Sequence, residues 1–314
     1  MTIAPFGDLL STLDQYWLGQ RPLVHHLLVA MITGGHVILE GVPGTGKTLV
    51  VKLLAKLIQA QFRRVQLTPD MLPSDIVGVN VFDFQQQSFN LKRGPIFTEI
   101  LLADEVNRTP PKTQSALLEA MEEKQVTLDG NTYPLSDGFW VVATQNPLKF
   151  EGTYPLPEAQ LDRFLFKLTV SYPAATAAKQ MLLNYQQGFQ AVRQDLEKLS
   201  AIATVEQVLT ARQDLENMEV KENLLDYLLS LVEKTRNHPD LALGASPRAM
   251  LRWLQAAKAD AWLNEQDYLL PDNSKAVAIP LLSHRLMLKP EAQLEGVNLN
   301  TVITTLLEQT PVPR

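Results

Sequence analysis

The stretch "GVPGTGKT", at residues 41–48, has residue types and spacing suited to hold the phosphates of a nucleotide. The phosphate-loop pattern G-x-x-x-x-G-K-[ST] is matched at Gly41, Gly46, Lys47 and Thr48. The glycines let backbone N–H groups close on phosphate oxygens, Lys47 would reach the β- and γ-phosphates, and the Thr48 hydroxyl would ligate Mg²⁺. We therefore expect ATP and Mg²⁺ as cofactors, with the nucleotide held by Gly41, Val42, Pro43, Gly44, Thr45, Gly46, Lys47, Thr48 and Leu49.

A second stretch, "EILLADE" at residues 99–105, is typical of a buried strand that ends in two carboxylates. In this Walker B pattern, Asp104 would hold Mg²⁺ through water, and Glu105 would orient and polarise the attacking water. Taken alone, the two acids could equally be solvated or cap the next helix. Beside a phosphate loop the catalytic interpretation is favoured, and it predicts hydrolysis rather than binding alone.

A third apolar strand, "VVATQ", ends next to Asn146. An amide at that strand end would lie beside the γ-phosphate and could help to position the water, because ligands bind at the carboxyl ends of parallel strands. The competing interpretation is an Asn that turns the chain before Pro147. The local sequence leaves both interpretations open.

Two arginines are candidates for stabilising the charge on the transferred phosphate. Arg163 lies at the edge of the last predicted core strand. Arg248 lies in "GASPRAM", where Ser246 can cap a helix and Pro247 can begin it. A positive charge in a first helical turn opposes the helix macrodipole, so a nearby anionic phosphate would explain it. For each arginine the alternative is a surface salt bridge, worth ~0–1 kcal/mol.

The elements that must position these residues alternate between strand and helix. Residues 36–40, "HVILE", form a short apolar run before the phosphate loop, and an amphipathic helix follows the loop. Continuous apolar runs recur in "RVQL", "EILLADE", "FWVVATQN" and "RFLFKLTV", as in buried parallel strands. This alternation predicts an α/β fold in which helices cover an open parallel sheet.

Two predicted hairpins interrupt the alternation. "VNVFDFQQQSFNLKRG" has turn signals near residues 85–87, and "QVTLDGNTYPLSDGF" has them near residues 129–131. Between them, "TPPKTQSALLEAMEEKQV" is typical of a helix that Thr109 would cap and Pro110 would begin. Past Pro173 the pattern is mostly helical, so we place a domain boundary there.

The composition is that of an ordinary globular protein. The 314 residues are 46% apolar and 20% charged, which is enough to bury a core. The net charge of -6 argues against a general nucleic-acid binder, and the lack of cysteine excludes disulfides. No signal peptide and no apolar run long enough to span a bilayer stand out, so we expect a cytoplasmic protein without an integral membrane segment.

Together these blocks resemble the MoxR family of AAA+ ATPases. The resemblance covers most of the chain, from "GGHVILEGVPGTGKT" through "RVQLTPDMLPSDIVG", "LLADEVNRTPPKTQSALLEAMEEKQVTLDG" and "VVATQNPLKFEGTYPLPEAQLDRF" to "GASPRA" and "SHRL". It implies an AAA+ αβα core with a parallel sheet at residues 1–173, followed by a small all-helical lid at residues 174–314. The two hairpins would be the family's helix-2 insert and pre-sensor-1 hairpin.

The resemblance also implies roles for single residues. Asn146 would be the sensor 1 residue and Arg248 the sensor 2 residue of the lid. Arg163 resembles the arginine finger, which reaches the ATP of a neighbouring subunit, and Gln20 resembles the residue that lines the adenine. Such subunits form a homo-oligomeric ring that is usually a hexamer.

Members of this family act as chaperone-like remodellers of a protein client, often with a partner that carries a von Willebrand factor A domain. This chain has no D-x-S-x-S motif, so that domain would come from another polypeptide. The alternative is a nucleic-acid motor or loader on the same core, which would need a basic pore. Only Lys92, Arg93 and the pair Arg63–Arg64 point to one, and they are weak evidence. A nucleotide-dependent scaffold with little turnover is a third hypothesis, and the intact Glu105 argues against it.

Overall fold

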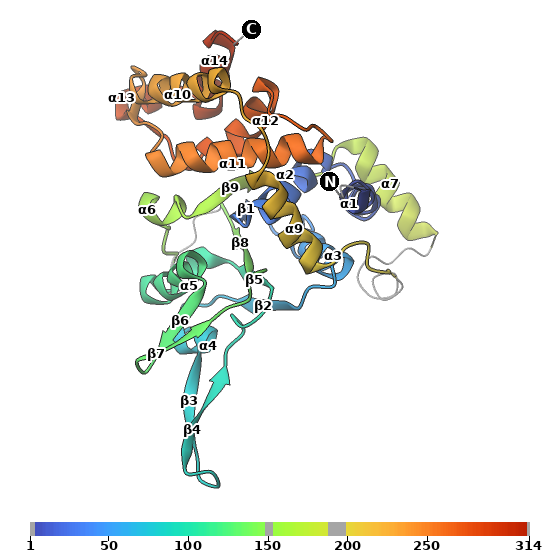
Figure 1. Cartoon of the computed structure of the whole chain (residues 1–314), viewed down its shortest axis with the longest axis vertical. Helices are drawn as coiled ribbons and strands as arrows, with labels where there is room; N and C mark the ends of the chain where they lie inside the picture. Colours follow the sequence, from blue (N-terminus) through green and yellow to red (C-terminus); the bar gives the residue numbers. More distant parts are fainter. Residues whose placement is uncertain (1–3, 148–152, 188–198, 313–314) are drawn as a thin grey trace.

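The computed structural model describes residues 4–147, 153–187 and 199–312, and its centre is a five-stranded parallel sheet (Figure 1). The strands lie in the order β2-β5-β8-β1-β9, and all neighbouring pairs are parallel. Their bounds are β1 His36–Glu40, β2 Phe62–Gln66, β5 Ile100–Asp104, β8 Trp140–Gln145 and β9 Phe164–Thr169. The carboxyl ends of these strands therefore meet at one edge, as the alternation predicted.

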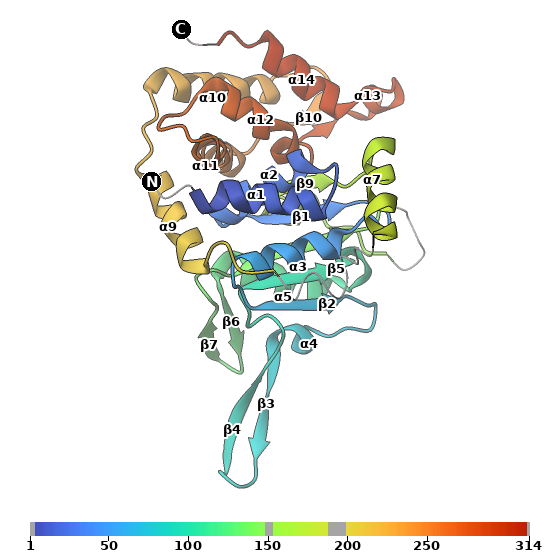
Figure 2. The ribbon, with the colours of Figure 1, turned by 90° about the vertical axis from the view of Figure 1, so that its right-hand side faces the viewer.

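Both faces of the sheet are buried, which explains the continuous apolar runs. In β1, Val37 and Leu39 point into one hydrophobic cluster and Ile38 into the other. The first cluster includes residues of α1 (Ala4–Tyr16), α2 (Arg21–Thr33) and α3 (Lys47–Leu57), and Figure 2 shows α3 lying along the strands. The second includes residues of α4 (Pro73–Val77), η1 (Val106–Arg108) and α5 (Pro111–Glu123). The predicted αβα layering is confirmed.

The start of α5 differs from the sequence prediction by one residue. Pro110 is the N-cap and Pro111 the first helical residue, so Thr109 is not the cap. The Thr109 side chain is buried instead, and its hydroxyl has no hydrogen-bond partner among the described residues. Two successive prolines fit both positions because neither needs to donate a backbone hydrogen bond there.

Both predicted hairpins are present. β3 (Gly78–Asp83) and β4 (Ser88–Arg93) pair antiparallel around a turn at residues 84–87. β6 (Gln125–Leu128) and β7 (Asn131–Pro134) pair around Asp129 and Gly130, which both have positive φ. Figures 1 and 2 agree that the β3–β4 hairpin projects far from the sheet. Its tip is therefore free to contact another molecule.

The part of the chain after the sheet is mostly helical (Figure 1). A short helix, α6 (Glu158–Leu161), precedes β9, and α7 (Ala175–Gln186) and α9 (Val205–Glu216) follow it. The remaining helices are α10 (Glu222–Arg236), α11 (Pro247–Leu263), α12 (Pro271–Leu282), α13 (Pro290–Leu294) and α14 (Leu299–Gln309). Among them, β10 (Leu241–Leu243) and β11 (Met287–Leu288) add a small antiparallel ladder to the expected helices.

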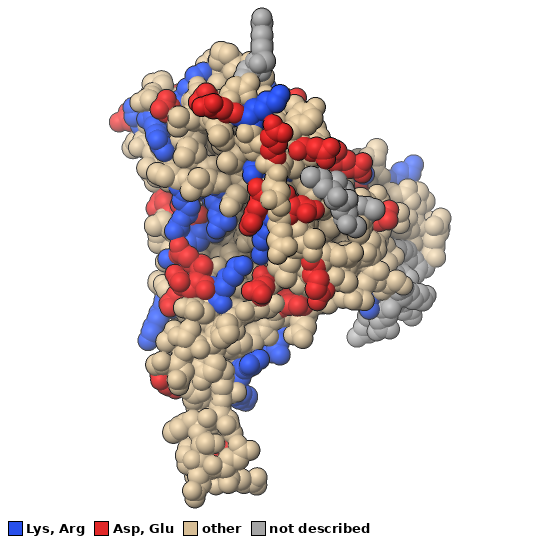
Figure 3. All heavy atoms as spheres, in the orientation of Figure 1, with Lys and Arg blue, Asp and Glu red and all other residues tan. Residues whose placement is uncertain are grey.

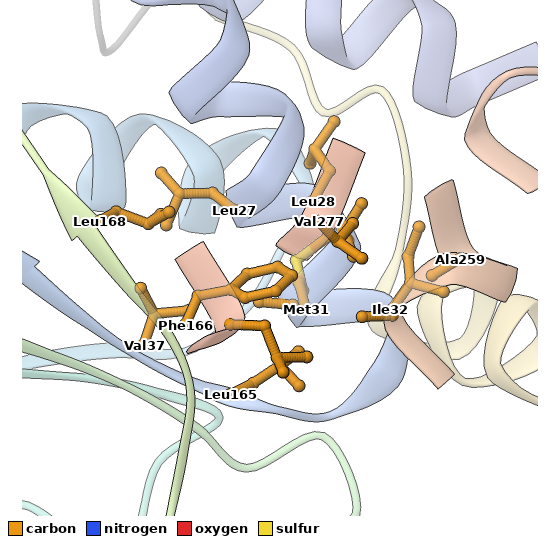
Figure 4. Packing of buried hydrophobic residues seen from close by; sticks show 14 of the residues in the cluster. Leu27, Leu28, Met31, Ile32, Val37, Leu165, Phe166, Leu168, Ala259 and Val277 are labelled. Carbon is orange, nitrogen blue, oxygen red and sulfur yellow. The ribbon is translucent and has the colours of Figure 1, made fainter. Parts of the chain in front are cut away.

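Helix α2 joins the sheet to the helical part. Figure 4 shows Leu28 and Met31 of α2 between Phe166 of β9 and Val277 of α12, and all four side chains belong to one buried cluster. Because the same cluster continues from α3 to α14, burial alone marks no break at residue 173. The division into domains at residues 1–173 and 174–314 stays a prediction. Among the described helices, none is both long and apolar enough to cross a membrane.

Candidate active site

A cavity of about 910 Å³ lies at the carboxyl ends of the strands. Its wall brings together most of the residues that the sequence predicted for nucleotide and metal. These are Gln20, Gly41, Pro43, Gly44, Thr45, Gly46, Lys47, Thr48, Leu49, Asp104, Glu105 and Asn146. The volume is within the range of small-molecule and cofactor sites.

The phosphate loop has the backbone that its glycines permit. Gly44 and Gly46 both have φ of +82°, in the left-handed region, and Gly46 is the N-cap of α3. Lys47 Nζ donates to the carbonyl oxygens of Gly41 at 2.7 Å and Val42 at 2.8 Å. Val42 is not part of the cavity wall, but its carbonyl oxygen helps to hold the Lys47 side chain. Burial lowers the pKa of Lys47, and the carboxylates of the site partly oppose this.

Asp104 is buried at the end of β5 and uses both carboxylate oxygens. Thr144 Oγ1 donates to Asp104 Oδ1 at 2.9 Å, and Arg64 Nε donates to Asp104 Oδ2 at 2.5 Å. The backbone N–H of Glu105 donates to the same Thr144 hydroxyl oxygen at 2.9 Å. From the neighbouring strand β8, Thr144 therefore orients the Asp104 carboxylate and holds the backbone of Glu105.

Glu105 has an unusual backbone and two polar neighbours. Its φ is 60° and its ψ 50°, a left-handed conformation that costs a non-glycine residue about 1–3 kcal/mol and is enriched at active sites. Gln66 Nε2 donates to Glu105 Oε2 at 2.8 Å, and Arg108 Nε lies 3.2 Å from the same oxygen. Arg64 Nη2 donates to Gln66 Oε1 at 3.1 Å, so Arg64 is linked to both carboxylates.

The carboxylates fit a magnesium site. Mg²⁺ prefers carboxylate and hydroxyl oxygens, and Asp104 and Thr48 supply these on the wall of the same cavity. The Asp104 carboxylate already lies against a positively charged group, Arg64. The donor set therefore suits a cation at this place, and in this structure the Arg64 guanidinium is the cation beside Asp104.

Asn146 follows β8 and lies in the same cavity wall, nine-tenths buried. Asn107 Nδ2 of η1 donates to its backbone carbonyl at 3.5 Å. The structure thus brings Asn146 to the edge that carries Asp104 and Glu105, as expected for a strand end. Its role in positioning water stays a prediction.

The cavity wall also contains the predicted Gln20 and several residues that the sequence prediction missed. Gln20 Nε2 donates to the Ser171 carbonyl at 3.1 Å, and Trp17 Nε1 donates to the carbonyl of Thr45 in the phosphate loop at 3.2 Å. Tyr16, Met181 and Tyr185 add apolar surface, the last two from α7. Aromatic residues beside a phosphate loop suit a flat base, but their distance from it in the sequence hid them.

Arg163 and Arg248 do not line this cavity. Both meet Glu122 of α5: Arg163 Nη1 lies 3.2 Å from Glu122 Oε2, and Arg248 Nη2 lies 2.5 Å from Glu122 Oε1. Figure 3 shows Lys and Arg side chains gathered with acidic ones on the face between α11 and α5. Ser246 is the N-cap of α11 and accepts from the Ala249 N–H at 3.0 Å, so the predicted position of Arg248 in a first helical turn is confirmed.

Comparison with known proteins identifies the family. Residues 36–166 match the ATPase family associated with various cellular activities (AAA), and residues 233–306 match the AAA lid domain. Chaperone MoxR1 of Mycobacterium tuberculosis is 38% identical to this chain over 306 residues, covering 95% of this chain and 79% of the relative. This chain belongs to the MoxR family of AAA+ ATPases.

Two further matches each cover nearly the whole chain. The uncharacterized protein YeaC of Bacillus subtilis is 43% identical over 307 residues, covering 98% of this chain and 94% of YeaC. A crystal structure of a candidate ATPase from Cytophaga hutchinsonii has a TM-score of 0.90 and 38% identity, and the match covers 99% of this chain and 96% of that one. The predicted AAA+ core and lid are therefore confirmed, and nucleotide binding follows from the family.

Proposed function

We propose that this MoxR protein hydrolyses ATP with Mg²⁺ in a ring of identical subunits and uses the energy to remodel a protein client. The observation that carries the proposal is the meeting of Asp104 and Glu105 with the phosphate loop in one cavity. A protein that only binds nucleotide does not need the second carboxylate. The cytoplasm, where ATP is abundant, is the compartment that fits this activity.

The residues of the cavity divide the chemistry between them. The loop N–H groups and Lys47 bind the phosphates, after Lys47 has exchanged the Gly41 and Val42 carbonyls for phosphate oxygens. Asp104 and Thr48 would hold Mg²⁺, which supplies positive charge against the phosphates. Glu105 accepts a hydrogen bond from the attacking water and polarises it, and Asn146 helps to hold that water in place.

Arg163 and Arg248 are proposed to act at the border between subunits. Both lie outside the cavity of their own chain, and their side chains are 31% and 48% exposed. Glu122 holds the two guanidinium groups together on one face, where a neighbouring subunit's phosphates would attract them more strongly than a single half-exposed carboxylate. An arginine acting in this way contributes ~10³–10⁵ in rate.

The β3–β4 hairpin favours a protein client. Phe82, Phe84 and Phe89 form a cluster of edge-to-face rings near its tip, and Phe84 and Phe89 are 86% and 70% exposed. Exposed aromatic rings suit apolar protein segments. Chaperone MoxR1 is a relative with a matching role in its name. A von Willebrand factor A domain protein remains the proposed partner.

The nucleic-acid alternative loses its basic candidates. Arg93 lies over the ring of Phe97 at 5.1 Å, and Arg64 is paired with Asp104 inside the nucleotide cavity. Lys92 lies in β4 next to Arg93 and opposite Val79. Arg63 lies on the other face of β2 from Arg64, so the four charges do not form one continuous surface for a phosphate backbone.

The test combines particle mass, ATP binding and ATP turnover for wild type and for Glu105→Gln. We expect the wild type to assemble with ATP and to hydrolyse it. Glu105→Gln should bind ATP with similar affinity and lose turnover by about 10²-fold or more, because it lacks the base. Equal turnover in the two proteins would refute hydrolysis by this site.

A further inference from the structure

Arg64 lies beside the Walker B carboxylates without a place in the proposed chemistry. In the parallel register of β2 and β5, Gln66 pairs with Asp104 and Arg64 with Leu102. Because side chains alternate along a strand, Arg64 and Gln66 lie on the face of the sheet that carries Asp104, and Arg63 lies on the other face. Strand pairing thus places a permanent positive charge next to the proposed metal ligand.

The contact engages one of the two oxygens that a metal would need. Arg64 Nε donates to Asp104 Oδ2 at 2.5 Å, while Thr144 occupies Oδ1. Hydrogen bonds between two ionised groups are about twice as strong as neutral ones. Arg64 therefore neutralises the charge of a carboxylate that would otherwise be buried with only a hydroxyl as its partner.

The two partners differ in their freedom to move. The Asp104 side chain is 8% exposed and is held by Thr144, whereas the Arg64 side chain is 47% exposed and lies in the cavity wall. Mg²⁺ at Asp104 would lie within a few ångströms of the guanidinium, and two cations at that distance repel each other. Arg64 is the partner that can leave.

We propose that Arg64 is a placeholder cation, which neutralises Asp104 before Mg²⁺ arrives and is displaced into the cavity when Mg²⁺ enters with ATP. The proposal rests on the proposed ATPase function and adds a positioning residue to it. Arg64 then competes with Mg²⁺ for Asp104. In the absence of Mg²⁺, Arg64 also shields the phosphates from the negative charge of Asp104.

The test measures how nucleotide binding depends on Mg²⁺, without measuring turnover. A fluorescent β,γ-imido analogue of ATP is titrated in EDTA and in saturating Mg²⁺ against wild type and Arg64→Gln. In Arg64→Gln the ratio of Kd in EDTA to Kd in Mg²⁺ should rise roughly tenfold or more, because a charged hydrogen bond is lost from Asp104. The Mg²⁺ concentration for half-maximal binding should fall by a similar factor.

Two further variants serve as controls. Arg64→Lys keeps a cation in reach of Asp104, so its ratio should stay within about threefold of wild type. Arg63→Gln removes a charge from the same strand but from the other face, so its ratio should match wild type. Melting temperatures measured without nucleotide check that each variant folds. If Arg64→Gln does not fold, Arg64→Met, whose side chain is neutral and of similar length, replaces it.

Two results would overturn the placeholder role. One is an Arg64→Gln ratio within about twofold of wild type. The other is an equal loss of affinity in EDTA and in Mg²⁺, which would make Arg64 a direct ligand of the phosphates. A wild-type protein that binds no nucleotide would refute the proposed function itself, and the placeholder role with it.

Discussion

At the scale of single residues, Gly41 shows how closely the phosphate loop approaches β9. A Cβ at Gly41 would lie 2.4 Å from the carbonyl oxygen of Val170. The backbone of Val170 is held in place, because its N–H donates to the carbonyl oxygen of Glu40 at 2.7 Å. We predict that Gly41→Ala lowers the free energy of unfolding by about 1–3 kcal/mol, as overpacking does, and weakens ATP binding. Urea unfolding and nucleotide titration measure the two effects.

Gly7 provides the matched control for this prediction. It lies in α1, and a Cβ there would meet nothing within 4 Å. Gly7→Ala should therefore raise the free energy of unfolding by about 0.5–1 kcal/mol through helix propensity. A Gly41→Ala protein as stable as wild type would show that the loop can move away from Val170.

Most of the site residues that the sequence revealed are close together in the chain, whereas Gln20 was suggested by family resemblance and Asn146 by its place at a strand end. Lys47 and Thr48 belong to one loop, and Asp104 precedes Glu105. Arg64 and Thr144 were missed as site residues because each is 40 residues from Asp104 and reaches it through strand pairing. The sequence analysis considered Arg63–Arg64 only as candidates for nucleic-acid binding; both lie within β2, and Arg64 faces Asp104.

At the scale of elements, the start of β1 depends on a neutral histidine. His36 Nδ1 accepts from the Val141 N–H at 2.9 Å, and Nε2 lies 3.0 Å from the Met121 carbonyl, to which its N–H donates. Burial lowers the pKa of His36 from 6.5 to about 4, and the positive charges of Lys124 and Arg252 add to this. The hydrogen bond from the Val141 N–H to Nδ1 therefore exists only while His36 is uncharged, whereas the backbone pairing of β1 with β8 does not depend on it.

This low pKa predicts acid sensitivity. The folded state binds the proton less readily than the unfolded state, so the contribution is complete above pH 6.5 and is lost as the pH falls towards 4. Compared with His36→Gln, wild type should lose about 2 kcal/mol more stability between pH 7 and pH 5. Urea unfolding at the two pH values measures this, and parallel losses in both proteins would contradict it.

Elements were predictable where the pattern was strong. Apolar runs predicted the strands and turn residues predicted both hairpins, because both signals are contained in short stretches of sequence. The beginning of α5 was wrong by one residue because Pro110 and Pro111 both suit a helix start. The position of α7 over the nucleotide cavity is a tertiary property, which its sequence pattern does not contain.

At the scale of the whole molecule, the nucleotide cavity is separate from the face that carries Arg163 and Arg248. The cavity lies at the strand ends, whereas Arg163 and Arg248 meet at Glu122 of α5. The sequence suggested the two arginines through helix chemistry and family resemblance, but it could not show that they share one carboxylate. Their separation from the cavity supports the proposal that each site is completed by a neighbouring subunit.

Mixing two inactive variants tests this proposal most directly. Glu105→Gln lacks the base and Arg163→Ala lacks the arginine, so each should have little turnover alone. If Arg163 acts on its neighbour, a mixed ring contains borders with an intact Glu105 on one side and an intact Arg163 on the other. ATP turnover of an equal mixture should then recover to roughly a quarter of the wild-type rate. A mixture that assembles with ATP, as particle mass would show, and stays inactive would contradict the shared active site.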